Sequence, residues 1–273
     1  MVDCDHNCEG CSVENCGSRK IEKLKPNELS NIKHCYAIMS GKGGVGKSLV
    51  TSLIASELSK RGKSVAIIDA DVTGPSIPQA FGLKGKFAPS DETHIYPVLS
   101  KSGIKIISAN LLLQDEEAPI VWRGPIVSGF VQQLFTDVVY GDVDYMFIDM
   151  PPGTSDIPLT IFQMLPIDGV IVVTSPQELV SMVVTKSINM AKMLMIPMVG
   201  VVENMAYVKC PNCNEKIRIY GDEHSKENIE KNGVEVLAEL AIDPKLASLV
   251  DKGLIEDYKC DSLDKLIEKI SSK

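Results

Sequence analysis

Short apolar runs alternate along the chain with stretches long enough to form helices. The runs show no alternation of apolar and polar positions, and they are Tyr36–Met39, Val65–Ile68, Tyr145–Ile148, Val170–Thr174 and Val199–Val202. Continuous apolar runs of this length are typical of strands that are buried on both faces of a parallel sheet. Their separation by helical segments indicates βαβ units. The pattern therefore predicts an α/β fold, a doubly wound and mostly parallel sheet with helices on both faces.

Two helices can be placed from local signals. The first is expected from about Lys47 to Arg61, with Gly62 as its C-cap because glycine readily adopts the left-handed conformation that ends many helices. The second lies near the C-terminus, where one apolar face has the spacing i, i+3, i+4, i+7. That face consists of Leu263, Leu266, Ile267 and Ile270. Its opposite face mixes acids and lysines, so we expect this helix to dock on the sheet and not on a membrane.

The domain organisation follows from where this periodicity begins and where it is interrupted. Residues 1–30 lack it and are rich in cysteine, so they predict an N-terminal appendage that depends on a bound metal or cluster for order. Residues 31–273 predict one globular domain. Within that domain, residues 207–219 break the rhythm of strands and helices and predict an inserted, hairpin-like knuckle.

Charge and length exclude several classes of protein. The chain has 273 residues, 44% of them hydrophobic, and a formal net charge of -8. An acidic chain without a basic stripe is a poor partner for nucleic acid. The polar start Met1–His6 does not resemble a secretory signal, and no apolar stretch reaches the roughly 18 residues of a membrane span. We therefore expect a cytoplasmic protein that has neither a nucleic acid nor a membrane as its partner.

One motif carries a specific chemistry. The residues Gly41, Lys42, Gly43, Gly44, Val45, Gly46, Lys47 and Ser48 match the phosphate-binding pattern G-x-x-x-x-G-K-[ST]. The motif follows an apolar strand and opens a helix, which is the context that the pattern requires. Its glycines let backbone N–H groups turn onto phosphate oxygens at a helix N-terminus. We expect ATP here, with Lys47 on its phosphates and the Ser48 hydroxyl on Mg²⁺.

Acidic residues follow two of the predicted strands. Asp69 and Asp71 come after Val65–Ile68, and Asp149 comes after Tyr145–Ile148. The carboxyl ends of parallel strands are where α/β sheets bind ligands. A carboxylate there can hold the Mg²⁺ shell or position the attacking water, and Asp71 and Asp149 are the stronger candidates.

The eight cysteines fall into two groups and two single residues. In a reducing compartment they are poor candidates for disulfides. Cys35 and Cys260 stand alone and are expected to be small buried side chains. Cys210 and Cys213 form a Cys-x-x-Cys pair, and the remaining four lie within the first 16 residues: Cys4, Cys8, Cys11 and Cys16.

The Cys-x-x-Cys pair offers two thiolates to one metal, whereas a zinc or [4Fe-4S] site usually has four protein ligands. A two-fold dimer would repeat Cys210 and Cys213 on the second copy and supply four. The alternative is a structural zinc knuckle that two other ligands complete.

The four N-terminal cysteines could wrap one cluster without a partner, and His6 is a further candidate ligand. A [4Fe-4S] cluster, a [2Fe-2S] cluster, zinc and a transient metal-handling tail are all compatible with their spacing.

The motif Lys42–Ser48 resembles the deviant Walker A motif of the MinD, ParA and nitrogenase iron protein class. In that class the extra lysine, here Lys42, reaches the nucleotide of the partner across a sandwich dimer. Three further segments resemble the Mrp/ApbC branch, whose members are scaffold or carrier ATPases for iron–sulfur clusters. The segments are Asp69–Pro78, Trp122–Pro125 and Asp149–Asp156. The N-terminal cysteines are similar to those of eukaryotic cytosolic relatives, with a shorter spacing.

The resemblance implies roles for individual residues. It puts Asp71 near the attacking water, Asp149 in the Mg²⁺ shell and Asn204 on the adenine ring, and it has Cys210 and Cys213 bridge a [4Fe-4S] cluster between two protomers. It implies a homodimeric, slow ATPase that transfers the cluster to apo-proteins, with Lys42, Lys47, Asp71 and Asp149 as its catalytic groups.

Two other functions compete with this one. A positioning ATPase of the MinD/ParA kind, with a structural zinc knuckle, would call for a basic amphipathic terminus or a basic surface. An electron donor like the nitrogenase iron protein would use a bridged cluster for redox chemistry.

Overall fold

The computed structural model describes residues 22–72, 74, 76–112, 124–153, 156–176, 178–219 and 233–272. Within these residues lies a nine-stranded sheet of order β3-β4-β2-β5-β1-β6-β7-β8, with β9 paired to β7. Its strands are β1 (Asn31–Ser40), β2 (Val65–Asp69), β3 (Val98–Leu99), β4 (Lys105–Ser108), β5 (Asp142–Asp149), β6 (Gly169–Thr174), β7 (Met198–Lys209), β8 (Lys216–Ile217) and β9 (Val236–Ala241). The β3–β4 and β7–β8 pairs are antiparallel and the other pairs are parallel. The predicted doubly wound sheet is confirmed.

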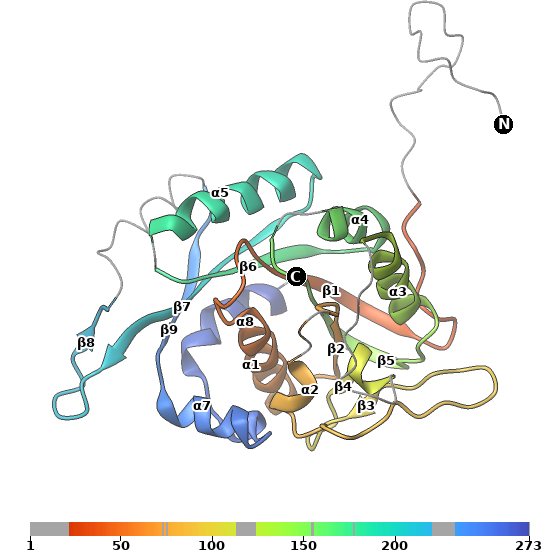
Figure 1. The fold of residues 1–273 in the computed structure, drawn as a ribbon, viewed down its shortest axis with the longest axis horizontal. Coiled ribbons are helices and arrows are strands. Elements are labelled where there is room, and N and C mark those ends of the chain that lie inside the picture. Colours follow the sequence, from red (N-terminus) through yellow and green to blue (C-terminus); the bar gives the residue numbers. More distant parts are fainter. Residues whose placement is uncertain are drawn as a thin grey trace, which may run out of the picture.

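Helices cover both faces of the sheet, as the sequence predicts (Figure 1). One face carries α1 (Lys47–Lys60), α2 (Ile77–Ala80), α7 (Pro244–Asp251) and α8 (Asp264–Ser271), with the short 3-10 turns Ile255–Asp257 and Asp261–Leu263. The other carries α3 (Gly124–Thr136), α4 (Asp156–Met164) and α5 (Glu178–Met193), and the 3-10 turn Ala109–Leu111 follows β4. The central strand β1 shows why two cores form. Tyr36 and Ile38 pack in the first layer, and Ala37 and Met39 pack in the second.

Helix α1 is buried along most of its length, and its two ends are set by glycines. Gly46, at the N-cap, has φ 82°. Arg61 is the C-cap, so the helix stops one residue earlier than predicted and Gly62 follows the cap with φ 76°. The N–H of Gly62 donates to the Ser59 carbonyl (2.9 Å), and that of Lys63 donates to the Leu58 carbonyl (3.2 Å). This pair of bonds is a Schellman motif, and it satisfies carbonyls that the helix end would leave bare.

The C-terminal apolar face docks on the sheet, as predicted. Leu266, Ile267 and Ile270 of α8 are buried, and Leu263 is buried in the turn that precedes the helix. They join the core layer that also holds α1. None of the described helices has the length and apolar character that crossing a bilayer requires.

Residues 207–219, referred to below as the thiol hairpin, form a β-hairpin that projects at one end of the sheet (Figure 1). Strand β7 continues beyond its pairing with β6 and β9, and its last two residues pair with β8 as Val208–Ile217 and Lys209–Lys216. The turn is closed by two backbone bonds of 2.9 Å, from the Cys210 N–H to the Glu215 carbonyl and from the Asn214 N–H to the Cys210 carbonyl. The predicted knuckle is thus a tight turn on an overhanging strand.

Candidate nucleotide site and thiol hairpin

The loop of residues 41–46 leaves β1 at the point where the chain order of the sheet reverses. Strand β1 lies between β5 and β6, and this reversal point is where open α/β sheets bind their ligands. Gly44 (φ 81°) and Gly46 (φ 82°) give the loop its left-handed turns. Beside it is a cavity of about 310 Å³ that is lined by residues of the loop, of α1 and of the β2–α2 connection. Its lining includes Gly43, Gly44, Gly46, Lys47, Ser48, Asp71 and Pro152.

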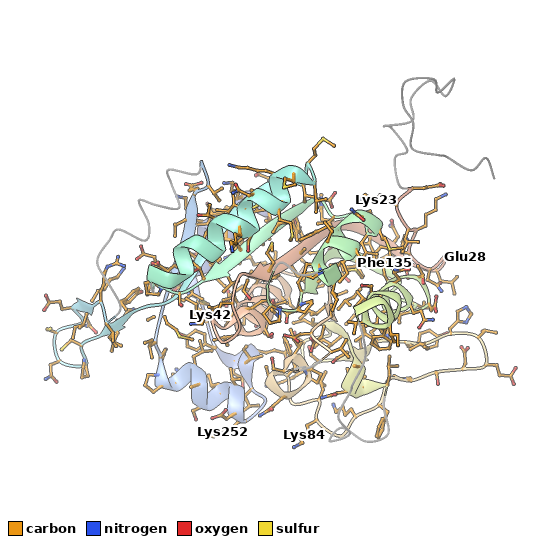
Figure 2. The ribbon with its side chains drawn as sticks, turned by 45° about the horizontal axis from the view of Figure 1, so that its top comes forward. Lys23, Glu28, Lys42, Lys84, Phe135 and Lys252 are labelled. Atoms are coloured by element: carbon orange, nitrogen blue, oxygen red, sulfur yellow. The ribbon has the colours of Figure 1, made fainter. Side chains whose placement is uncertain are left out.

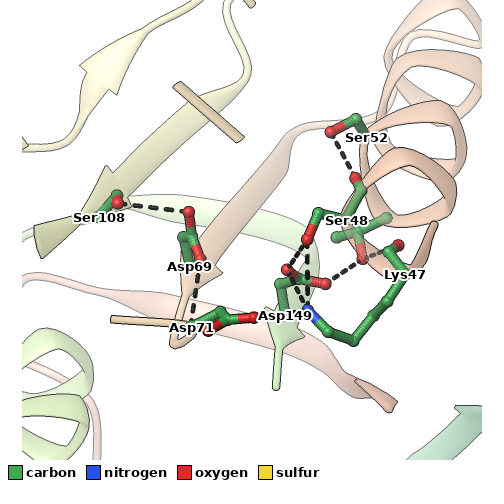
Figure 3. Close-up of polar contacts among 8 residues, drawn as sticks. Lys47, Ser48, Ser52, Asp69, Asp71, Ser108 and Asp149 are labelled. Carbon is green, nitrogen blue, oxygen red and sulfur yellow. Dashed lines mark hydrogen bonds and ion pairs between the residues drawn. The ribbon is translucent and has the colours of Figure 1, made fainter. Parts of the chain in front are cut away.

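Asp149 gathers the polar side chains at the base of this cavity (Figure 3). Lys47 Nζ donates to Asp149 Oδ2 at 2.6 Å, and Ser48 Oγ donates to the same oxygen at 2.6 Å. Lys47 is 6% exposed and Asp149 is fully buried. The two charges can be buried together because each neutralises the other within hydrogen-bonding distance. The structure thus brings three predicted residues from two elements to one point.

A third hydrogen-bond donor to Asp149 was missed by the sequence reasoning. Thr51 Oγ1 donates to Asp149 Oδ1 at 2.7 Å and lies 3.1 Å from the Lys47 carbonyl oxygen. A residue four positions after Lys47 on a helix lies on the same face, so the sequence could place Thr51 beside Lys47, but it could not show that Asp149 would face both. Ser40, at the end of β1, also lines the cavity and was missed. Its hydroxyl is buried and has no hydrogen-bond partner within the described protein.

The two other candidate acids lie beside Asp149. Asp69 is its direct neighbour in the sheet, accepts a hydrogen bond from the Asp71 N–H at 3.2 Å, and lies 3.3 Å from the Ser108 hydroxyl (Figure 3). Burial, and then the charge of Asp149, raise the pKa of Asp69 well above its usual range. Asp71 faces the cavity and comes within 3.8 Å of Lys47 Nζ. Asp69 therefore lies buried beside Asp149 and holds the backbone of Asp71, whereas Asp71 is the carboxylate that faces the cavity.

Asn204 lies behind the phosphate loop and does not line the cavity. Its Nδ2 donates to the Val45 carbonyl at 2.9 Å, and its side chain is buried. A Cβ at Gly46 would overlap that same Nδ2, so the close approach of β7 to the loop requires glycine there. The contact of Asn204 with adenine stays a prediction. What the structure adds is a direct bond from this strand to the loop.

Lys42 is the second residue of the phosphate loop (Figure 2). Its side chain is exposed to solvent, in contrast to that of Lys47. The two lysines of the motif are therefore held in different environments by the same short loop.

The thiol hairpin carries both thiols of the Cys-x-x-Cys pair on one turn. Cys210 is half-buried, Cys213 is exposed, and neither forms a disulfide. The backbone N–H groups of Asn212 and Cys213, followed by the Cys213 thiol, lower the pKa of the Cys210 thiol. A lowered pKa favours the thiolate, which is the form that binds metals. Among the described residues, no group of three or more His, Cys, Asp or Glu side chains is placed to hold a metal ion.

The remaining cysteines divide into two kinds. Cys35 and Cys260 are buried, as predicted, and burial raises the pKa of Cys260 to about 11. Their thiols are therefore inert, packed side chains. Cys4, Cys8, Cys11 and Cys16, with His6, lie outside the described residues, as do Trp122 and Arg123.

The chain matches a known protein family and several named proteins. The model of the ParA family, described as a NUBPL iron-transfer P-loop NTPase, matches residues 31–273. A protein of Methanocaldococcus jannaschii named iron-sulfur cluster carrier protein is 41% identical over 100% of this chain and 98% of its own. A protein of Clostridium perfringens with the same name is 42% identical over 92% of this chain and 90% of its own.

Solved structures agree with these matches. A nucleotide-binding protein of Archaeoglobus fulgidus, in complex with ADP, superposes with a TM-score of 0.76 and 40% identity, covering 85% of this chain and 91% of that one. The cell division ATPase MinD of Pyrococcus furiosus has a TM-score of 0.63 at 20% identity, covering 88% of this chain and 98% of its own. The second match supports the fold alone.

Proposed function

We propose that this chain, which belongs to the ParA family of NUBPL-type iron-transfer P-loop NTPases, is an ATP-dependent carrier of iron–sulfur clusters. It binds a [4Fe-4S] cluster between two copies and transfers it to apo-proteins in the cytoplasm. The observation that carries the proposal is the thiol hairpin, which presents Cys210 and Cys213 from one tight turn at the surface. The names of its curated relatives support the same cargo.

ATP is held by the loop of residues 41–48. The backbone N–H groups of Gly43, Gly44 and Gly46 face the phosphates, and Lys47 exchanges its bond to Asp149 for phosphate oxygens. Asp71, on the cavity wall, orients the attacking water. Few groups take part in chemistry, so hydrolysis is slow and serves as a switch.

Mg²⁺ fits the donor set at the base of the cavity. Ser48 Oγ and Asp149 Oδ2 are 2.6 Å apart, and oxygen donors of this kind are what the ion prefers. Bound there, the ion would neutralise phosphate charge. Thr51 holds the second oxygen of Asp149 and so fixes the direction of the carboxylate.

The second copy completes both sites. The exposed Lys42 reaches the nucleotide of the partner, and the partner repeats the thiol hairpin, which brings the thiolates to four. The cysteine-rich residues 1–30 form a separate metal-binding or cluster-binding tail on the ATPase domain of residues 31–273. In that tail, Cys4, Cys8, Cys11 and Cys16 hold a second cluster or zinc.

Metal analysis of the anaerobically purified protein tests the cargo. We expect about two irons and two sulfides per chain at the bridged site, which is half of one [4Fe-4S] cluster, in a particle with the mass of a dimer. Cys210→Ser with Cys213→Ser should lose that iron, whereas a variant with serine at the four N-terminal cysteines should keep it. Zinc that persists in the wild type without sulfide would reject the carrier and favour a positioning ATPase with a structural zinc knuckle.

A transfer assay tests the role of ATP. Lys47→Ala removes the phosphate contact and leaves the thiol hairpin unchanged, so iron loading should persist while delivery to an apo-protein stops. Lys47→Arg is the variant to compare with Lys47→Ala, because it keeps the positive charge but not the shape of the lysine side chain. Delivery at the wild-type rate by Lys47→Ala would contradict ATP-driven transfer.

A further inference from the structure

We propose that Arg218 is a positioning residue that connects the nucleotide site to the thiol hairpin. It follows β8 on the return arm of the hairpin, eight positions after Cys210. The inference rests on the proposed function, because it takes Cys210 and Cys213 as the cluster site. It adds the means by which the nucleotide acts on them.

Arg218 ties the thiol hairpin to two strands of the main sheet. Its Nη2 lies 3.2 Å from Glu239 Oε2 on β9, and its Nη1 lies 4.0 Å from Glu203 Oε2 on β7. Glu203 and Glu239 are directly opposite each other in the β7–β9 pairing. Like charges in that position repel, so the guanidinium between them stabilises the pairing. Glu203 is 1% exposed, and a carboxylate buried to this degree depends on a nearby cation.

The next residue on β7 touches the phosphate loop. Asn204 donates from Nδ2 to the Val45 carbonyl at 2.9 Å, and the absence of a Cβ at Gly46 makes that approach possible. The contacts therefore run from Val45 to Asn204, along the backbone to Glu203, and through Arg218 to the hairpin.

Strand β7 is irregular between Asn204, which contacts the phosphate loop, and the thiol hairpin. Met205 has φ 57°, which is uncommon for a side chain larger than glycine. The β7–β9 register shifts between Glu203 and Tyr207, on either side of it. Arg218 spans this irregular segment, since its guanidinium lies 4.0 Å from Glu203 before the segment and its backbone directly follows β8, which pairs with β7 after the segment.

Nucleotide that fills the loop fixes Val45 and, through Asn204, the start of this segment. Arg218 passes that constraint on to the hairpin, so the turn with Cys210 and Cys213 samples fewer conformations when nucleotide is bound. Without the Arg218 guanidinium the hairpin keeps its two β7–β8 pairs. It loses its side-chain contact with Glu203, next to the Asn204 that the nucleotide fixes. Coupling of this kind changes a property of the thiol hairpin between the nucleotide-free and nucleotide-bound states. It can be measured as the ratio of the thiol-labelling rate without nucleotide to the rate with nucleotide, called the protection ratio below.

Thiol alkylation of the reduced, metal-free protein measures that ratio. Trypsin releases both cysteines in one peptide, Cys210–Lys216, so mass spectrometry follows them apart from the other six. We expect a non-hydrolysable ATP analogue with Mg²⁺ to slow N-ethylmaleimide labelling of this peptide by about fivefold, at the low end of known couplings between sites. In Arg218→Gln the ratio should fall to about one, with the affinity for the analogue unchanged.

Three comparisons keep the test decisive. Arg218→Lys keeps the charge without the fork and should restore part of the ratio, and Glu239→Gln should lower it. Lys265→Gln, which breaks the exposed ion pair to Glu235 beside β9, should leave it at the wild-type value. Light scattering on each sample shows whether a change of dimer content accounts for the protection.

The protection ratio distinguishes a positioning role of Arg218 from a purely structural one. A purely structural arginine would change the labelling rate equally with and without nucleotide. A fivefold ratio that survives in Arg218→Gln, or a ratio of one in the wild type, overturns the proposal. Metal analysis of the Cys210→Ser/Cys213→Ser variant is a separate measurement, so failure of the carrier function and failure of the coupling are told apart.

Discussion

Gly46 and Gly44 offer a matched pair of substitutions in one loop. Both have left-handed backbone conformations, with φ 82° and φ 81°. A Cβ at Gly44 meets nothing within 4 Å, whereas a Cβ at Gly46 overlaps the amide nitrogen of Asn204. Alanine at either position therefore costs the left-handed strain, and alanine at Gly46 alone also displaces Asn204.

The two costs can be worked out separately. Left-handed strain for a residue with a Cβ is about 1–2 kcal/mol. Displacing Asn204 breaks its bond to the Val45 carbonyl and leaves both groups buried, which adds about 1–3 kcal/mol. We expect Gly44→Ala to lower the free energy of unfolding by about 1–2 kcal/mol, and Gly46→Ala to lower it by about 2–5 kcal/mol.

Urea unfolding of the nucleotide-free protein, followed by circular dichroism, measures both values. The decisive step is a double-mutant cycle with Asn204→Ala, because that change removes the atom that the new methyl group meets. In this background the cost of Gly46→Ala should fall to that of Gly44→Ala. If Gly46→Ala costs the same with and without the Asn204 side chain, the reasoning about close approach is refuted.

Two further substitutions test the buried carboxylates. Thr51→Val should lower the free energy of unfolding by about 1–3 kcal/mol, since Asp149 loses a buried donor, and Thr51→Ser should restore most of it in the same urea experiment. Asp69→Asn tests the raised pKa. Because its pKa is raised, Asp69 in the folded protein keeps its proton over a pH range in which the unfolded chain has lost it. The free energy of unfolding therefore falls by up to about 1.4 kcal/mol per pH unit as the pH rises from the pKa of the unfolded state towards that of the folded state. Asparagine removes that fall, so the Asp69→Asn variant should gain more stability relative to the wild type at pH 7 than at pH 5 in Mg²⁺-free buffer. An equal gain at both pH values would contradict the raised pKa of Asp69.

The elements that could be predicted from sequence are those whose signal is local. The buried strands show as uninterrupted apolar runs, and the phosphate loop shows as eight consecutive residues between a strand and a helix. The turn at Cys210 and Cys213 is likewise encoded within a few positions. In each case the residues that determine the structure are neighbours in the chain.

The contacts that escaped prediction join residues far apart in the sequence. Thr51 bonds Asp149 across 98 positions, and Asn204 bonds Val45 across 159. Nothing near Thr51 in the chain shows that a carboxylate from another strand will face it. The raised pKa of Asp69 is similar, because it depends on burial and on the register that sets Asp69 beside Asp149. Such features follow from the packing of strands, which periodicity alone does not determine.

The overhang of β7 gives the molecule two regions of unequal stability. Beyond the sheet, the thiol hairpin has two cross-strand pairs and mostly exposed side chains, whereas the second half of β1, Cys35–Ser40, is buried between two helical layers. Backbone amides in the hairpin should therefore exchange with deuterium through small local openings, and those of this buried half of β1 only through global unfolding. The part of the chain that would change its ligands is thus the part that can rearrange while the core stays folded.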